Sequence, residues 1–441
     1  MASHSKRKPR ERTMNDEPIL SGRMMFYGDA AFLASTAKVT LKTSPDLQLL
    51  QEAVNGAAKQ HLWVTYGVRE EGGLFYYSDN LSHAITIAEW NDDEPTVLGG
   101  KESDGHLLGV YYQGRDIRFC IFHGLTDGDG LLSFVDATMS RYAALLRGES
   151  LALESACYPD AEAEPLMAVD QALHEAGIPW DPQAMGSGLP NEDYATHEYL
   201  ADAGDGSRTF FVSADAAGLV GFAKERGVKV SAALVSLYAG AVQRVHPDVR
   251  RMRVAMPVNF RDALGIPHTF RNCAMPPAMY DIEVGEGDGV NEIADQVNQT
   301  ILKVTSPVAK LYTVKGFATH MDMLPPMPYA QAEMVIAQTM SVDRPPFTFN
   351  CSYAGRYSDE GYLELIDHVY FMTPAYGSAP VLEVIAMPDR FYITINQGGS
   401  TNVYVQAYLD VLQENGIDAR LDATEPGARQ YVALRETLGL R

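Results

Sequence analysis

The chain has 441 residues, of which 46% are hydrophobic and 21% charged, a composition typical of a soluble globular protein with room for two domains. With 35 basic and 57 acidic side chains, its net charge of −22 repels phosphate backbones and argues against nucleic acid as a partner. No run approaches about 18 apolar residues, so no membrane-spanning helix is expected. The four cysteines include no C-x-x-C pair, which fits a reducing cytoplasm and indicates neither a zinc site nor a disulfide framework.

The first part of the chain predicts a mixture of helices and strands. The basic segment 1–18 is expected to be a flexible tail, because no apolar stretch of signal-peptide length follows it. Apolar residues at helical spacing predict a helix over residues 45–60. The segments 63–68 and 73–77 predict the two strands of a β-hairpin.

A possible catalytic motif follows, in the segment H-G-L-T-D-G of residues 123–128. Alternating side chains predict a strand over residues 115–123, and apolar spacing from Leu131 to Leu145 predicts a helix. The motif therefore delivers a base and an acidic residue at a strand end, in a glycine-rich turn before a helix. Catalytic side chains often lie in such turns; the alternative for His123 is a structural histidine at the end of a strand.

The second half is predicted to be a further arrangement of helices and strands after a linker. Prolines and glycines indicate a linker over residues 151–195, with a short helix at 166–176. We therefore place the N-terminal half at residues 19–195 and the C-terminal half at 196–441. The elements predicted after the linker are strands at 208–212, 252–259, 347–353 and 391–396, the last of the chain, and helices at 214–225, from Ser231 onward and at 403–412.

Taken together, these elements resemble the chloramphenicol-acetyltransferase-like superfamily, which includes condensation domains of peptide synthetases, alcohol acetyltransferases and wax ester synthases. The H-H-x-x-x-D-G motif of that group is matched by His123, Asp127 and Gly128, with Phe122 in place of its first histidine. The segment P-V-N-F-R at 257–261 resembles its P-V-N-x-R segment, and N-C-S-Y-A-G-R at 350–356 resembles its S/N-x-x-G-R strand. The D-F-G-W-G motif of the plant branch is absent, so the chain is not placed there.

The resemblance implies an α/β (α+β) fold of two similar halves in a V, with a tunnel between them and His123 at its middle. It implies that His123 acts as a general base on an alcohol or amine, which then attacks a thioester held by coenzyme A or by the phosphopantetheine arm of a carrier protein. Asp127 would orient the motif turn through an ion pair with an arginine of the second half. Arg261 is the candidate partner, and a solvated arginine is the alternative.

The remaining candidates have lesser roles. Gly128 belongs to the structural motif with Arg261, whereas Asn259, Ser352 and Gly355 are candidates for lining the tunnel or the oxyanion site. Asp127 has an alternative as a turn residue that binds only its own backbone amides. For Ser352, the alternative is an ordinary strand serine.

The chemistry of thioesters supports this interpretation independently of the resemblance. A thioester is already activated, so transfer needs a base with a pKa near neutrality but no acyl-enzyme intermediate. It also needs hydrogen-bond donors for the developing oxyanion, which Ser352 or backbone amides near Gly355 could supply. Because a single base suffices, Phe122 is expected to point to the opposite strand face from His123 and to pack in the core.

We therefore predict a cytoplasmic acyltransferase, of the kind that transfers groups other than amino-acyl groups, without metal or redox cofactor. Its substrates would be an acyl-CoA and a small alcohol or amine. One alternative is an enzyme whose acyl donor is bound to a carrier protein. Another is a non-catalytic protein that binds a carrier or an acyl ligand, which the acidic charge and Phe122 leave open.

Overall fold

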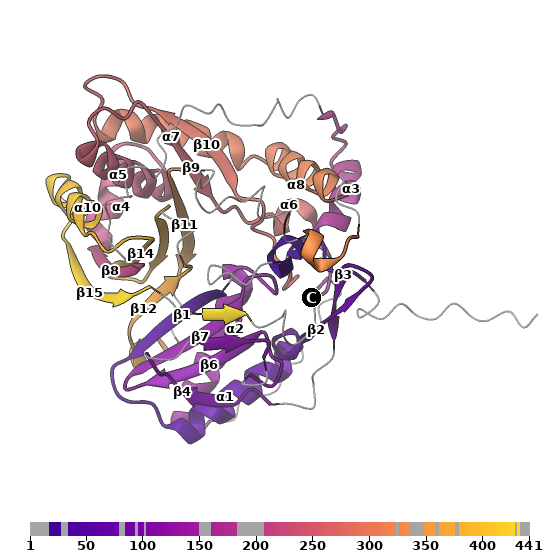
Figure 1. Ribbon diagram of the computed structural model, residues 1–441. Coiled ribbons are helices and arrows are strands. Elements are labelled where there is room, and N and C mark those ends of the chain that lie inside the picture. Colours follow the sequence, from indigo (N-terminus) through magenta and orange to yellow (C-terminus); the bar gives the residue numbers. More distant parts are fainter. Residues whose placement is uncertain are drawn as a thin grey trace, which may run out of the picture.

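The computed structural model of the protein contains two large β-sheets with helices on their outer sides (Figure 1). Two large hydrophobic cores accompany them, one on each side of the second sheet. The structure describes residues 17–27, 34–78, 84–92, 96–100, 103–149, 160–182, 207–322, 326–332, 334, 347–357, 361–374, 379–427 and 430–432.

The first sheet has five strands in the order β12-β1-β7-β6-β4. The bounds of these strands are β12 (Ile366–Met372), β1 (Ala34–Leu41), β7 (Asp116–Phe122), β6 (Leu108–Gln113) and β4 (Ile87–Glu89). Helices α1 (Leu47–Gln60) and α2 (Gly128–Leu146) pack against each other beside this sheet. The predictions of a helix at 45–60, a strand at 115–123 and a helix after the motif are thus confirmed.

The predicted hairpin is also present, with one correction at its start. It consists of β2 (Gly67–Glu71) and β3 (Leu74–Ser78), but Trp63 to Thr65 belong to a 3-10 turn, η4 (Leu62–Thr65). The amide of Tyr66 donates back to the carbonyl of Trp63 at 3.1 Å, which closes this turn directly after α1. Burial of Trp63 and Val64 therefore stabilises a turn where the aromatic run predicts a strand.

The second sheet has seven strands in the order β10-β9-β11-β13-β14-β8-β15. Their bounds are β10 (Ala278–Glu283), β9 (Arg251–Met256), β11 (Phe349–Arg356), β13 (Val381–Ala386), β14 (Arg390–Gln397), β8 (Arg208–Asp215) and β15 (Ala419–Pro426). One face packs against the helices α4 (Ala216–Glu225), α5 (Val230–Val245), α7 (Val290–Val304) and α10 (Val403–Glu414). Nearer the first half lie α3 (Pro165–Glu175), α6 (Arg261–Leu264) and α8 (Pro307–Asp322).

The expectation that 391–396 is the last strand is wrong. Strand β15 follows it at the sheet edge, and β16 (Gln430–Val432) pairs with β5 (Thr96–Leu98) in a small parallel sheet. Most residues of β15 are exposed, although its first five residues, A-R-L-D-A, alternate apolar and polar side chains. This run is short and two of its three apolar residues are alanines, so it is a weak signal for an edge strand held largely by backbone hydrogen bonds.

The first sheet takes one strand from the second half of the chain. Strand β12 pairs antiparallel with β1, with Val369 opposite Val39. Between the two sheets the ring of Phe211, on β8, packs edge-on against Tyr370, on β12, with centroids 4.8 Å apart. The inner face of the second sheet is thus turned toward the first sheet. The V-shaped arrangement with a tunnel stays a prediction.

Two further predictions concern the linker at 151–195 and the N-terminal tail at 1–18. The part of the predicted linker at 160–182 is described, and α3 confirms the short helix expected at 166–176. The rest of the linker, and the tail apart from residues 17 and 18, lie outside the described residues. Among the described helices, none has the length and apolar character needed to cross a bilayer.

Candidate active site

His123 directly follows β7, and its ring is fixed by the turn behind it. The Nδ1 atom lies 3.0 Å from the carbonyl oxygen of Thr126. Because a carbonyl oxygen only accepts, Nδ1 carries the proton and Nε2 keeps its lone pair in the neutral ring. The side chain of Asn272, from the second half, donates to the carbonyl oxygen of His123 at 3.0 Å. Both the ring and the backbone of His123 are therefore held in place.

The surroundings favour the neutral form of this histidine. Loss of water around the ring lowers the pKa of His123, although the Thr126 carbonyl and the Asp127 charge act in the opposite direction. The residue as a whole is still partly exposed to solvent. At neutral pH the group is accordingly an unprotonated base at an accessible position.

Phe122 packs as expected. Its side chain is fully buried, and its ring meets that of Phe26 edge-on with centroids 4.8 Å apart. The position of the missing histidine is thus part of the core. The neighbour of His123 contributes packing energy and no proton-transfer group.

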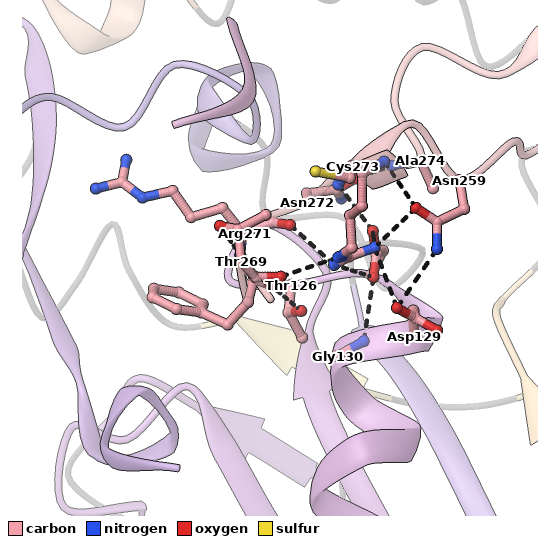
Figure 2. Close-up of polar contacts among 12 residues, drawn as sticks. Thr126, Asp129, Gly130, Asn259, Thr269, Arg271, Asn272, Cys273 and Ala274 are labelled. Atoms are coloured by element: carbon pink, nitrogen blue, oxygen red, sulfur yellow. Dashed lines mark hydrogen bonds and ion pairs between the residues drawn. The ribbon is translucent and has the colours of Figure 1, made fainter. Parts of the chain in front are cut away.

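Asp127 caps α2 and also forms a buried ion pair. Figure 2 labels residues around this pair, among them Gly130 and Cys273. Its Oδ1 accepts from the amide of Gly130 at 3.2 Å, and its Oδ2 accepts from the amide of Cys273 at 2.7 Å. Nη1 and Nη2 of Arg261 each donate to one carboxylate oxygen at 2.9 Å. The structure thus combines the two alternatives for Asp127, since the residue caps its own turn and binds an arginine of the second half.

Every hydrogen-bonding nitrogen of the Arg261 guanidinium has a partner. Besides Asp127, Nε donates to the Thr269 carbonyl at 2.9 Å and Nη2 to the Arg271 carbonyl at 3.1 Å. The Asp127 and Arg261 side chains are only 2% and 4% exposed, so this pair is screened very little by water. Burial would raise the pKa of Asp127, but the Arg261 charge and the hydrogen bonds lower it below its ordinary value. Burial would lower the pKa of Arg261, but Asp127 raises it.

Two positions in the motif turn require a very small residue. A Cβ on Gly130 would lie 1.9 Å from Oγ1 of Thr126, and a Cβ on Gly128 would lie 3.3 Å from the ring of Phe371. The Thr126 hydroxyl is occupied, since it donates in a short hydrogen bond to the Phe270 carbonyl. The glycines therefore let the turn, β12 and the segment around Phe270 approach one another closely.

Asn259 lies beside the ion pair, on its exposed side. Its Oδ1 accepts from the amide of Arg261 at 3.0 Å, and its Nδ2 lies 3.4 Å from Oδ2 of Asp129. Asp129 is largely exposed, with 62% of its side chain open to solvent. Asn259 is thus brought to the motif, although its role in binding a substrate stays a prediction.

Ser352 and Gly355 lie on β11, apart from this cluster. Ser352 is opposite Glu383 of β13 in the sheet register. Gly355 has a φ of +95°, in the left-handed region, where the register shifts between Tyr353 and Arg356. Within the described part of the chain, no hydrogen bond joins either residue to His123. Their proposed contacts with substrate stay predictions.

The segment 269–273 is the part of the site that sequence reasoning missed. Three backbone carbonyls, one backbone amide and the Asn272 side chain of this segment bind the motif or its partner Arg261. Backbone groups leave no trace in residue type. A single asparagine about a dozen residues after the P-V-N-F-R segment is no pattern by itself, so only the three-dimensional structure assigns a role to Asn272.

No protein-family model matches the chain, and no curated protein is significantly similar to it in sequence. Solved structures are similar to it in fold. Polyketide synthase associated protein 5 from Mycobacterium tuberculosis is 15% identical, over 90% of this chain and 96% of its own, with a TM-score of 0.59. The epimerization domain from the third module of tyrocidine synthetase B is 12% identical, over 87% and 90%, with a TM-score of 0.55.

TRI101 of F. sporotrichioides, solved in complex with coenzyme A and T-2, is likewise similar. It is 12% identical, over 91% of this chain and 98% of its own, with a TM-score of 0.55. These solved structures show that the chain shares their mixed α/β fold. The resemblance to the chloramphenicol-acetyltransferase-like superfamily itself rests on the sequence motifs.

Proposed function

We propose that the protein is an acyltransferase that moves an acyl group from a thioester to an alcohol or amine, with His123 as the general base. The observation that carries the proposal is the tautomer of His123. The Thr126 carbonyl accepts a hydrogen bond from Nδ1–H at 3.0 Å. Nε2 of this partly exposed residue is then left as the acceptor. A base held in this way has a fixed direction and a pKa that keeps it neutral.

The reaction proceeds by direct transfer. Nε2 of His123 accepts the proton of the acceptor O–H or N–H as the oxygen or nitrogen bonds to the thioester carbonyl carbon. The tetrahedral intermediate then collapses with cleavage of the C–S bond. The thiolate takes the proton back from the imidazolium, so that an ester or amide and a free thiol leave. The backbone amides near Gly355 are the proposed donors to the oxyanion, because the Ser352 hydroxyl already donates its proton to the Glu383 carboxyl.

Asp127 and Arg261 act as positioning residues in this mechanism. The four polar partners of the Asp127 carboxylate fix the turn that carries Thr126, and Thr126 in turn fixes the His123 ring. Asp127 therefore needs no proton of its own. Asn259 is proposed to contact substrate on the exposed side of this pair.

Coenzyme A is the proposed carrier of the acyl group. TRI101, a structure of the same fold, is complexed with coenzyme A, which supports this choice. The net charge of −22 weighs against docking of an acidic carrier protein. In the proposed arrangement the two substrates enter a tunnel between the halves from opposite faces. The likeness to an epimerization domain of a peptide synthetase keeps a carrier-bound donor as the second candidate.

The test is release of free thiol from a panel of acyl-CoAs with alcohols and amines. His123→Ala should lose about 10²–10⁴ in rate, the usual contribution of a general base. The matched control, His320→Ala, removes an exposed histidine on α8 and should leave the rate unchanged. Burial lowers the pKa of His123 below 6.5, the ordinary value of histidine. As the pH is lowered, kcat/KM should therefore begin to fall only at a pH below 6.5.

Other results would contradict the proposal in recognisable ways. Full turnover by His123→Ala would move the base to another group. Release of thiol from an acylated carrier protein, and from no acyl-CoA, would favour the carrier-bound donor. Tight binding of acyl ligands without release of thiol from either donor would favour the non-catalytic alternative.

A further inference from the structure

A buried acidic side chain lies on the inner face of the second sheet. Glu383, on β13, is 5% exposed. Its neighbours Leu382 and Val384 belong to the core on the helix side of the sheet, whereas Ile385 belongs to the core shared with the first sheet. Because side chains alternate along a strand, Glu383 points with Ile385 toward the first sheet.

The hydrogen bonds of this carboxyl are incomplete. The hydroxyls of Ser352 and Thr373 bind it, but its Oε2 atom is buried without a hydrogen-bond partner among the described residues. Oδ1 of Asn350 is a second buried acceptor in the same state. Asn350 and Ser352 lie on one face of β11, and Ser352 is opposite Glu383 in the register, so the two acceptors are diagonal neighbours.

Within the described part of the chain, no cation offsets the charge of Glu383. Loss of water raises the pKa of its carboxyl to about 7, and only the two hydroxyls act against this shift. A buried carboxylate without a partner is costly, and an unpaired buried acceptor adds to the cost. The cluster of Asn350, Ser352 and Glu383 therefore lacks a donor that also carries positive charge.

A chain of contacts links the cluster to the strand that precedes His123. Oγ1 of Thr373 lies 3.1 Å from Oγ of Ser35, which is opposite Ile121 in the register of β1 and β7. Ile121 precedes His123 by two residues, roughly 7 Å along an extended chain. Asn350, Ser352 and Thr373 are each partly exposed, so the buried carboxyl lies beneath side chains that solvent reaches.

A second path leads to the same place. Thr394 is opposite Glu383 in the register of β13 and β14, and its hydroxyl donates to the Phe371 carbonyl at 2.6 Å. The Phe371 ring is the group that a Cβ on Gly128 would meet at 3.3 Å. Three steps, through Thr394 and Phe371, therefore connect Glu383 with the motif turn at Gly128.

We propose that Asn350, Ser352 and Glu383 form a subsite for a primary ammonium group of the acceptor substrate. An ammonium supplies three donors and one positive charge, which match Oε2 of Glu383, Oδ1 of Asn350 and the Ser352 hydroxyl. A hydroxyl group would satisfy one acceptor but would leave the carboxylate charge uncompensated. The acceptor is then an amino alcohol or a diamine: one end reaches His123, and the charged end binds the subsite. The role as acceptor rests on the proposed function, whereas binding of the ammonium group does not.

The first experiment measures binding by calorimetry, with n-hexylamine and hexan-1-ol as probes. Wild type and His123→Ala should bind the amine equally well and at least tenfold more tightly than the alcohol, whereas Glu383→Gln should lose the preference. Because the carboxyl of the free protein has a pKa of about 7, binding at pH 7 should release about half a proton, and at pH 9 almost none. Proton release is visible as a dependence of the binding enthalpy on the buffer.

The second experiment measures thiol release with amino alcohols of increasing chain length, alongside the matching diols. Wild type should have a length optimum for the amino alcohols, and Glu383→Gln should lose it. Absence of amine preference and of proton release in the wild type overturns the subsite, even if thiol is released. Amine binding with proton release but without any thiol release supports the subsite and contradicts the acyltransferase. If Glu383→Gln does not fold, proton release on binding of n-hexylamine to the wild type still decides whether the subsite exists.

Discussion

Two buried carboxylates of this protein, Asp127 and Glu383, lie in opposite electrostatic situations. Asp127 has an arginine on both oxygens and two backbone amides, and its pKa lies below the ordinary value. Glu383 has two hydroxyls and a buried oxygen without a partner among the described residues, and its pKa lies above the ordinary value. The completed set of partners at Asp127 fits a structural role, whereas the incomplete set at Glu383 is the one that the proposed ammonium ligand would complete.

The largest effect on stability is expected at the completed site. Asp127→Ala leaves the buried Arg261 charge with only the largely exposed Asp129, 3.5 Å away, as a counter-charge, so the free energy of unfolding should fall by about 3–5 kcal/mol. Arg261→Ala should act alike, and the double variant should cost less than the sum of the two. Urea unfolding of all three variants measures this coupling. Additive losses would mean that the two side chains do not stabilise each other.

A matched pair provides the control for that experiment. Arg253 binds Asp281 in the same two-point manner, at 2.6 and 2.9 Å, but the Asp281 side chain is 28% exposed. Asp281→Ala should therefore cost clearly less than Asp127→Ala, because water replaces the lost carboxylate. Thiol release should fall with Asp127→Ala, through displacement of His123, and should be unaffected by Asp281→Ala.

The incomplete site should appear in the pH dependence of stability. Burial raises the pKa of Glu383 from 4.5 to about 7 in the folded protein, so the folded state binds the proton more tightly than the unfolded state. The protonated Glu383 carboxyl therefore contributes to the free energy of unfolding. This contribution, on the order of 3 kcal/mol, is fully present below pH 4.5 and is lost as the pH rises through 7. Glu383→Gln should remove this part of the pH dependence.

The measurement is the free energy of unfolding of wild type and Glu383→Gln between pH 5 and about 9. The variant should gain stability relative to the wild type as the pH rises. Saturating n-hexylamine should restore part of the wild-type stability at high pH. A constant difference between the two proteins across this range would contradict the raised pKa and weaken the contrast with Asp127.

The contrast between the two sites also explains what the sequence could predict. The resemblance of the H-x-x-x-D-G motif and of the P-V-N-F-R segment to the superfamily implied both partners of the ion pair, so Asp127 and Arg261 could be named in advance. The backbone groups of 269–273 and the Asn272 side chain could not, because they act through position and not through a residue pattern. Glu383 did leave a signal, one acidic residue in the apolar run V-L-E-V-I-A, which is unusual for a buried strand.

The fold follows the same division. Amphipathic helices such as α1 and α2 are predicted well, because each has one face for the core and one for solvent. Strands β12 and β13 were not predicted. Strand β13 is buried on both faces, so its sequence has no alternation, and β12 joins a sheet whose other strands lie hundreds of residues earlier. The tertiary pairing that defines such strands is not encoded in a local window.

The smallest of the expected stability effects tests how tightly the completed site is packed. Gly130→Ala would place a Cβ 1.9 Å from Oγ1 of Thr126, which is held by its hydrogen bond to the Phe270 carbonyl. Relief requires a shift of the turn, and overpacking of this kind costs about 1–3 kcal/mol. Alanine is more favourable than glycine in a helix by about 1 kcal/mol. This gain offsets part of the cost, so the net loss in the free energy of unfolding should be smaller.

The companion variant Thr126→Ala removes the group that the new methyl meets. In the Thr126→Ala background, Gly130→Ala should therefore cost less than in the wild type, or even stabilise α2. Thermal unfolding of the four proteins measures this coupling. A purely additive pair would mean that the turn yields without resistance, and the rigidity attributed to the support of His123 would then have to come from Asp127 and Arg261 alone.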